Sequence, residues 1–198
     1  MQTSRGVMSG LTTTPMTQSS TAIAEIKNYI LAKGLQPGDA LPTESQLCTD
    51  LGVSRSSVRE AVRTLVALDI VEVRITLDNA LTEPVTQAWK NRQDPELDQI
   101  VEQMDLHAQK GELFTDQDRR FHMRLLEPLD NHLFLHLTEA FWAVHTLTVP
   151  LLGAPRPEDM VATARAHRDM LQAARAGDAQ AYRQAVTQHY APLLAALT

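Results

Sequence analysis

The chain has 198 residues, of which 43% are hydrophobic and 21% are charged, a composition typical of folded globular proteins and unlike that of disordered ones. No apolar run approaches the roughly 20 residues that span a bilayer, so we expect no membrane association. The net charge of −6 argues against nucleic-acid binding. However, most of the excess negative charge lies in the second part of the chain. Residues 21–74 carry six basic and seven acidic side chains, whereas residues 75–198 carry eleven basic and seventeen acidic ones. The single Cys48 excludes an internal disulfide and fits a cytoplasmic location.

The first part of the chain predicts three short helices after a polar tail. Residues 1–20 are rich in Ser, Thr and Gln and lack the apolar stretch of a secretion signal, so we expect a flexible tail. A first helix then ends at Gly34, and Thr43 caps a second helix that ends at Gly52. Ser54 caps a third. Two short helices around a glycine turn predict a helix-turn-helix domain over residues 21–75.

The remaining sequence predicts a strand, a linker and a helical domain. β-Branched residues at 70–74 are typical of a strand, and the weaker pattern over 76–95 predicts a linker with a shortened wing. Helical patterns follow over 96–110, 115–127, 131–148, 158–176 and 178–196. We therefore expect a mainly α protein, with an N-terminal winged helix-turn-helix and a C-terminal antiparallel helical bundle over 96–198.

Three arginines mark the third helix as the DNA-reading element. Arg55, Arg59 and Arg63 share one helical face, and an arginine can fork onto guanine in the major groove while hydroxyls suit phosphate oxygens. The alternative is a solvated arginine face with partners such as Glu60.

The surrounding residues closely resemble the GntR family of regulators. The matching runs are 35–47, Leu51-Gly52-Val53-Ser54-Arg55 and Val58-Arg59-Glu60-Ala61-Val62-Arg63-Thr64-Leu65. The resemblance implies a winged helix-turn-helix that binds double-stranded operator DNA as a homodimer. It implies that Arg55 and Arg59 are the main contacts, and the expected DNA-binding set is Thr43, Ser54, Arg55, Ser56, Ser57 and Arg59. This chain departs from the family in having Asp69 where a glycine is usual and no glycine in the wing.

A carboxylate and three histidines in the second part suggest a metal site. Asp118 and His122 lie four residues apart on one helical face, and His167 and His189 lie on two later helices. Together they can form an open site for a divalent transition metal. His132 and His136 have the same spacing and form a rival pair.

Residues 96–197 resemble the FCD sensor domain found in one subfamily of GntR regulators. The matching segments are 116–122, 166–171, 174–179 and 186–190. The resemblance implies that Asp118, His122, His167 and His189 hold Zn, Ni or Mn and that a small carboxylate effector reaches the metal. The family's effector-binding arginine has no obvious match, and Arg119 is the candidate, with Arg120, Arg124 and Arg165 as further possibilities.

We therefore expect a ligand-controlled transcription regulator, most simply a repressor, and not an enzyme. Two alternatives stay open. The glycine-poor wing allows a degenerate member that dimerises but binds DNA weakly and acts as an interaction protein. A metal site with an open position can also activate water, as in a metal-dependent hydrolase, although Glu127 and Glu139 are unassigned as acid/base partners.

Overall fold

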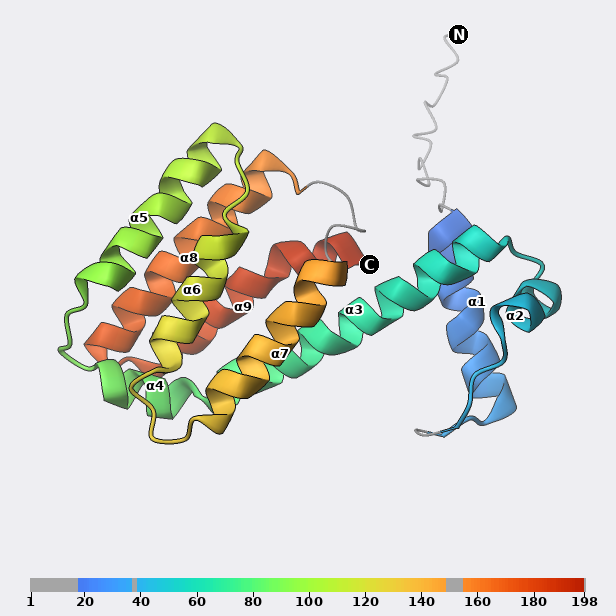
Figure 1. Ribbon diagram of the computed structural model, residues 1–198, viewed down its shortest axis with the longest axis horizontal. Coiled ribbons are helices and arrows are strands. Elements are labelled where there is room, and N and C mark those ends of the chain that lie inside the picture. Colours follow the sequence, from blue (N-terminus) through green and yellow to red (C-terminus); the bar gives the residue numbers. More distant parts are fainter. Residues whose placement is uncertain (1–17, 37–38, 149–154, 198) are drawn as a thin grey trace, which may run out of the picture. The chain divides into compact units, whose positions relative to one another are not determined.

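The computed structural model describes residues 18–36, 39–148 and 155–197, and these form helices joined by short connections, with no strand (Figure 1). The chain divides into two compact units, residues 1–62 and 63–198. None of the described helices is long and apolar enough to cross a membrane. Of the tail expected over residues 1–20, residues 1–17 lie outside the described part, whereas 18–20 already belong to the first helix.

The first unit contains α1 (Gln18–Lys33), α2 (Glu44–Leu51) and the start of α3 (Arg55–Ala80). The Thr43 hydroxyl accepts a hydrogen bond from the Gln46 amide at 3.3 Å, which caps α2, and Gly52 ends it with a φ of 66° that favours glycine. The Ser54 hydroxyl caps α3 by accepting from the Ser57 amide at 3.1 Å. These helices confirm the predicted helix-turn-helix. Its buried core is Ala22, Ile26, Leu47, Val58 and Ala61.

The prediction of a strand at residues 70–74 is wrong, because α3 continues as one helix to Ala80. The linker expected over 76–95 is also wrong: these residues complete α3, form α4 (Thr82–Trp89) and begin α5. The chain has no Gly between 52 and 111 and no Pro between 42 and 84, so nothing interrupts the helix there. The helical penalty of a β-branched residue is only a few tenths of a kcal/mol, which burial of one helical face outweighs. Ala67 and Val71 lie on that buried face.

The second unit is an antiparallel helical bundle, as predicted, but it begins at residue 63 rather than at residue 96. Its core packing places α8 along α9, with α4 and α5 against α8 and α6 between α5 and α7. Gly177, with a φ of 70°, forms the tight turn between α8 and α9. The remaining helices agree with the predicted ranges to within two residues at each end: α5 (Pro95–Lys110), α6 (Thr115–Leu126), α7 (Leu133–Thr148), α8 (Pro157–Ala176) and α9 (Ala179–Leu197).

Candidate functional site

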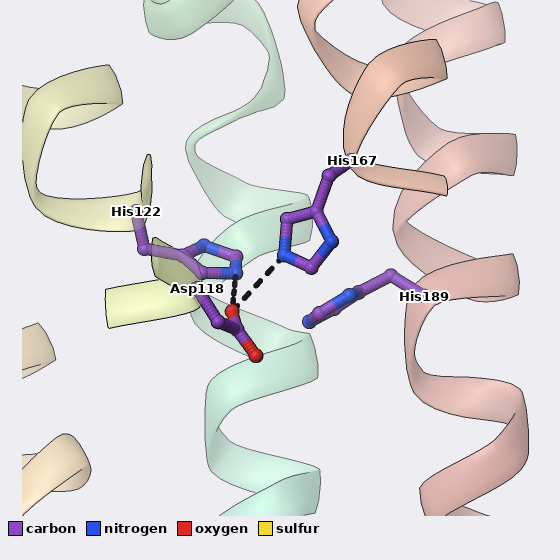
Figure 2. A group of neighbouring side chains, drawn as sticks. All are labelled: Asp118, His122, His167 and His189. Carbon is purple, nitrogen blue, oxygen red and sulfur yellow. Dashed lines mark hydrogen bonds and ion pairs between the residues drawn. The ribbon is translucent and has the colours of Figure 1, made fainter. Parts of the chain in front are cut away.

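The four residues expected to bind a metal come together inside the second unit (Figure 2). Asp118 and His122 lie one turn apart on α6, His167 lies in the middle of α8, and His189 lies in the middle of α9. Each offers one ligand atom, and these atoms all lie within 4.8 Å of one another. The three histidines are buried. Long-range packing of α6, α8 and α9 thus brings together residues that are up to 71 positions apart.

Hydrogen bonds orient His167 for metal binding. Its Nδ1 donates to the Thr163 carbonyl oxygen at 2.8 Å, one turn earlier on α8. This bond fixes the tautomer and leaves Nε2 to face the cluster, where it lies 3.0 Å from Oδ1 of Asp118. Metal-binding histidines commonly donate their other ring N–H to a carbonyl or carboxylate. The local geometry therefore fits a ligand histidine better than a histidine that only fills the core.

The other two histidines also present nitrogen atoms to the cluster. Nε2 of His122 lies 3.3 Å from the same Oδ1 of Asp118. Nδ1 of His189 is buried and has no hydrogen-bond partner among the residues that the structure describes. Nε2 of His122 is likewise without a hydrogen-bond partner there. A buried polar atom without a partner is destabilising, and an ion bound between these side chains would satisfy Nε2 of His122. One carboxylate and three imidazoles form a donor set suited to a divalent transition metal, so the residues fit such an ion.

In the metal-free cluster, electrostatics favour an ionised Asp118 and a neutral His189. Burial raises the pKa of Asp118, but the neighbouring imidazoles of His167 and His122 outweigh it and hold this pKa well below its usual value. Burial, followed by the charge of His167, lowers the pKa of His189 well below 6.5. The site therefore favours an ionised carboxylate beside a neutral imidazole, which is how each binds a cation.

A cavity of about 620 Å³ adjoins the cluster and is lined in part by Asp118 and His189. Volumes of this size are typical of small-molecule sites. Arg74 of α3 also lines it and is only 4% exposed. Its Nη1 donates to Nδ1 of His145 at 3.1 Å, and its guanidinium lies over the rings of Trp142 and Tyr190, at 4.7 and 5.4 Å from their centroids.

Arg74 is the functional candidate that the sequence analysis missed. The β-branched residues around it indicated a strand, which placed it in the DNA-binding domain and away from the sensor domain. The available signal was helical spacing: Ala67, Val71 and Arg74 follow one another at i, i+4 and i+7, and all three are buried. A buried cation that lines a cavity beside a metal-type cluster can bind an anionic ligand.

The structure does not bring Arg119 to this cavity. Its Nη2 pairs with Oε1 of Glu139 at 2.6 Å, and its side chain is 44% exposed. Arg120 likewise pairs with Glu96 at the surface, at 3.1 Å. The rival histidines, His132 and His136, are exposed and are not part of the cluster.

The residues expected to contact DNA lie around the start of α3 in the first unit. Thr43, Ser54, Arg55, Ser56 and Arg59 are exposed, whereas Ser57 is buried. Oγ of Ser57 lies 2.8 Å from Oγ of Ser54, so the geometry gives Ser57 a place in the helix cap. Arg59 pairs with Glu44 of α2 at 2.9 Å, at an exposed position where such a pair is weak and easily exchanged.

Comparisons with known proteins match both parts of the chain. The model of the FCD domain matches residues 69–192, and the model described as bacterial regulatory proteins, gntR family, matches residues 18–75. The two matches overlap, which agrees with the absence of a separate wing between them in the described structure. The FCD match begins within α3, as does the second structural unit.

Individual curated relatives are also named as transcription regulators. The putative transcriptional regulatory protein NedR of Micromonospora viridifaciens is 44% identical over 98 residues, which cover 50% of this chain and 70% of that protein. A probable D-xylose utilization operon transcriptional repressor of Paenarthrobacter nicotinovorans is 25% identical over 203 residues, with 89% of each chain covered. The solved structure of E. coli McbR/YncC has the same fold, with a TM-score of 0.56 at 18% identity over 92% of this chain and 98% of that one. The chain therefore belongs to the GntR family of bacterial transcription regulators, in the group that carries an FCD domain, and not to a family of enzymes.

Proposed function

We propose that this regulator binds operator DNA as a homodimer in the cytoplasm and acts as a repressor whose operator affinity changes when a small carboxylate binds its second unit. The observation that carries the proposal is one cavity lined by Asp118 and His189 of the metal-type cluster and by the buried guanidinium of Arg74. The word repressor in the name of the relative from Paenarthrobacter supports the direction of control.

In this proposal each group has a defined role. Asp118, His122, His167 and His189 hold a divalent Zn, Ni or Mn ion. When bound, the ion supplies an open coordination position that accepts a carboxylate oxygen. Arg74 donates hydrogen bonds to the same anion, and its burial strengthens this attraction because few waters compete.

Control of DNA binding then follows from linkage. A ligand shifts an equilibrium only by its difference in affinity between two states, so the effector must bind the DNA-bound and DNA-free forms unequally. Arg55 and Arg59 are the residues we expect to contact the operator, because both are exposed near the start of α3. Thr43, Ser54 and Ser56 are placed to support phosphate contacts.

The deciding experiment is native mass spectrometry of the purified protein and of Asp118→Ala, with Glu112→Ala as an acidic control outside the cluster. The proposal expects about one transition metal ion per chain in the wild type and in the control, and little in Asp118→Ala. Equal metal content in all three proteins, or no uptake after reconstitution with Zn, Ni or Mn, would reject the metal site.

A second candidate function has its own observation in its favour. α3 continues as a helix to Ala80, through residues expected to form a wing, so this segment does not offer the wing that would reach the minor groove. A family member without it could dimerise and act through protein contacts while binding DNA weakly. Fluorescence anisotropy at one fixed salt concentration, with the DNA that flanks its own gene, separates the two. A submicromolar Kd for this DNA, lower than the Kd for random DNA, supports the repressor. Equal Kd values for the two DNAs support the alternative.

A further inference from the structure

The cavity beside the cluster is polar at the metal-type residues and mainly apolar at its other end. Its polar groups adjoin one another: Arg74 contacts His145 and lies over Tyr190, which follows His189 in α9. The apolar lining comes from the segment before α6, the first turn of α8 and the last turns of α9, namely Leu113, Phe114, Met160, Pro192, Leu193 and Ala196.

Helix geometry sets the depth of the apolar part. Met160 lies seven residues before His167 on α8, and Ala196 lies seven residues after His189 on α9. At 1.5 Å per residue, both lie roughly 10 Å along the helix axes from the histidines. Because α8 and α9 run antiparallel, these two displacements point in the same direction. The apolar lining thus extends one to two helical turns beyond the metal-type cluster, at one end of the bundle.

Three of the polar side chains along this stretch already have hydrogen-bond partners. The Thr163 hydroxyl donates to the Asp159 carbonyl oxygen at 2.8 Å, and the Thr146 hydroxyl donates to the Trp142 carbonyl oxygen at 3.1 Å. Both carboxylate oxygens of Asp159 accept from Arg156, at 2.7 and 3.0 Å. None of these three side chains has a donor left over, so a ligand that carried several hydroxyl groups into this part of the cavity would find few donors there, which opposes its binding.

We infer that the effector is an amphipathic carboxylate, with its acid group at the Arg74 end and a hydrocarbon body along the Leu113, Met160 and Leu193 lining. This inference rests on the proposed function, because it assumes that the cavity is the effector site. It narrows the ligand class from small organic acids in general to carboxylates with an apolar body, and it excludes polyhydroxylated sugar acids as the preferred ligands.

Isothermal titration calorimetry of the metal-loaded protein with four probes tests the inference. Lactate, 2-hydroxyhexanoate and 2-hydroxyoctanoate share one head group and differ only in chain length, and gluconate has a comparable head group with a polyhydroxylated body. Each fully buried methylene raises affinity by about fourfold. We expect affinity to rise along the series by on the order of 50-fold or more, with gluconate weaker than 2-hydroxyhexanoate.

A variant of the apolar lining checks that the gain arises in this cavity. Leu113→Ser removes an apolar contact at a residue that is 64% exposed, and Leu133→Ser is the matched control, since Leu133 is 57% exposed and does not line the cavity. Leu113→Ser should weaken 2-hydroxyoctanoate by at least about threefold and leave lactate unchanged, whereas the control should change neither. Circular dichroism confirms that both variants fold.

The outcomes separate this inference from the function on which it rests. Tight gluconate binding with no gain along the series would overturn the inference and leave carboxylate sensing in place. Equal loss of affinity for lactate and 2-hydroxyoctanoate in Leu113→Ser would also overturn it. Heat signals from none of the four acids, with the metal shown to be present, would reject carboxylate sensing together with the inference.

Discussion

Arg74 on α3 donates a hydrogen bond from Nη1 to Nδ1 of His145 on α7 at 3.1 Å, joining side chains that are 71 positions apart. Both residues line the cavity, and the guanidinium lies over the rings of Trp142 and Tyr190. Tyr190 is in turn held by its hydroxyl, which donates to Oδ2 of Asp78 on α3 at 2.6 Å. These contacts hold a buried cation at the edge of the metal-type cluster, and they underlie the first two predictions.

Replacing Arg74 should weaken binding of carboxylate ligands. Arg74→Met keeps much of the side-chain volume but removes the donors, and charge-assisted hydrogen bonds contribute about 1.5–3 kcal/mol. We expect the Kd for a 2-hydroxy acid to rise roughly 10- to 100-fold in calorimetry, with unchanged metal content. Arg120→Met, at a surface ion pair, is the control and should bind as the wild type does. An unchanged Kd in Arg74→Met would remove Arg74 from the ligand site.

His145 should make the metal-free protein less stable as the pH falls. Burial, and then the charge of Arg74, lower its pKa from 6.5 to about 4 in the folded protein. Above pH 6.5 the group is neutral in both states and contributes no pH dependence. Between pH 6.5 and 4 the unfolded chain binds a proton that the folded chain does not, so stability falls, by roughly 3 kcal/mol in total.

Urea denaturation at pH 7, 6, 5 and 4 measures this effect. The lowered pKa of His189 adds to the same loss, so the comparison is between the wild type and His145→Gln. The variant should lose less stability between pH 7 and 4 than the wild type does. Parallel pH profiles for the two proteins would show that His145 titrates normally when folded.

His167 should be required for metal binding and for stabilisation by metal. It is fully buried, and its Nδ1 is held by the Thr163 carbonyl. A metal that binds only the folded state raises the melting temperature, and the rise grows with its affinity. Adding Zn or Ni should therefore raise Tm for the wild type and for His136→Ala, an exposed histidine, but not for His167→Ala. A metal-dependent rise in His167→Ala equal to that of the wild type would contradict the assigned ligand set.

Substitutions at Asp69 test whether α3 continues as a helix at this position, where a glycine is usual in the family and a strand was expected to follow. It is exposed on α3, where alanine is favoured over glycine by about 1 kcal/mol. Chemical denaturation should therefore find Asp69→Ala more stable than Asp69→Gly by about this amount. In a turn with a positive φ the order would be reversed, because glycine is then the favoured residue.

Arg55 should contribute to operator binding. It is exposed in the first turn of α3, and a bidentate contact to guanine contributes about 1–3 kcal/mol of discrimination. Arg55→Ala should weaken binding to the DNA that flanks its own gene by roughly 10- to 100-fold in an anisotropy assay, with an unchanged melting temperature. Lys90→Ala, an exposed cation of the second unit, is the control. Equal affinities for Arg55→Ala and the wild type would remove this contact.

Much of the fold was predictable from the sequence because its signals are local. Thr43, Gly52 and Ser54 set the ends of α2 and the start of α3 through caps that involve only neighbouring residues. The pair Asp118 and His122 needed only the period of a helix, and its extension to His167 and His189 came from a family resemblance over their surroundings. Local capping and periodicity act over a few residues, so they can be read without the rest of the chain.

The tertiary structure decided which residues share a surface. The β-branched residues at 70–74 favour a strand locally, yet burial of Ala67, Val71 and Arg74 against the bundle keeps them helical. That placement brings Arg74 to the cavity and leaves Arg119, the sequence candidate, in an ion pair at the surface. Local preferences differ by tenths of a kcal/mol, whereas burying one helical face contributes several kcal/mol, and only the packed bundle shows which face is buried.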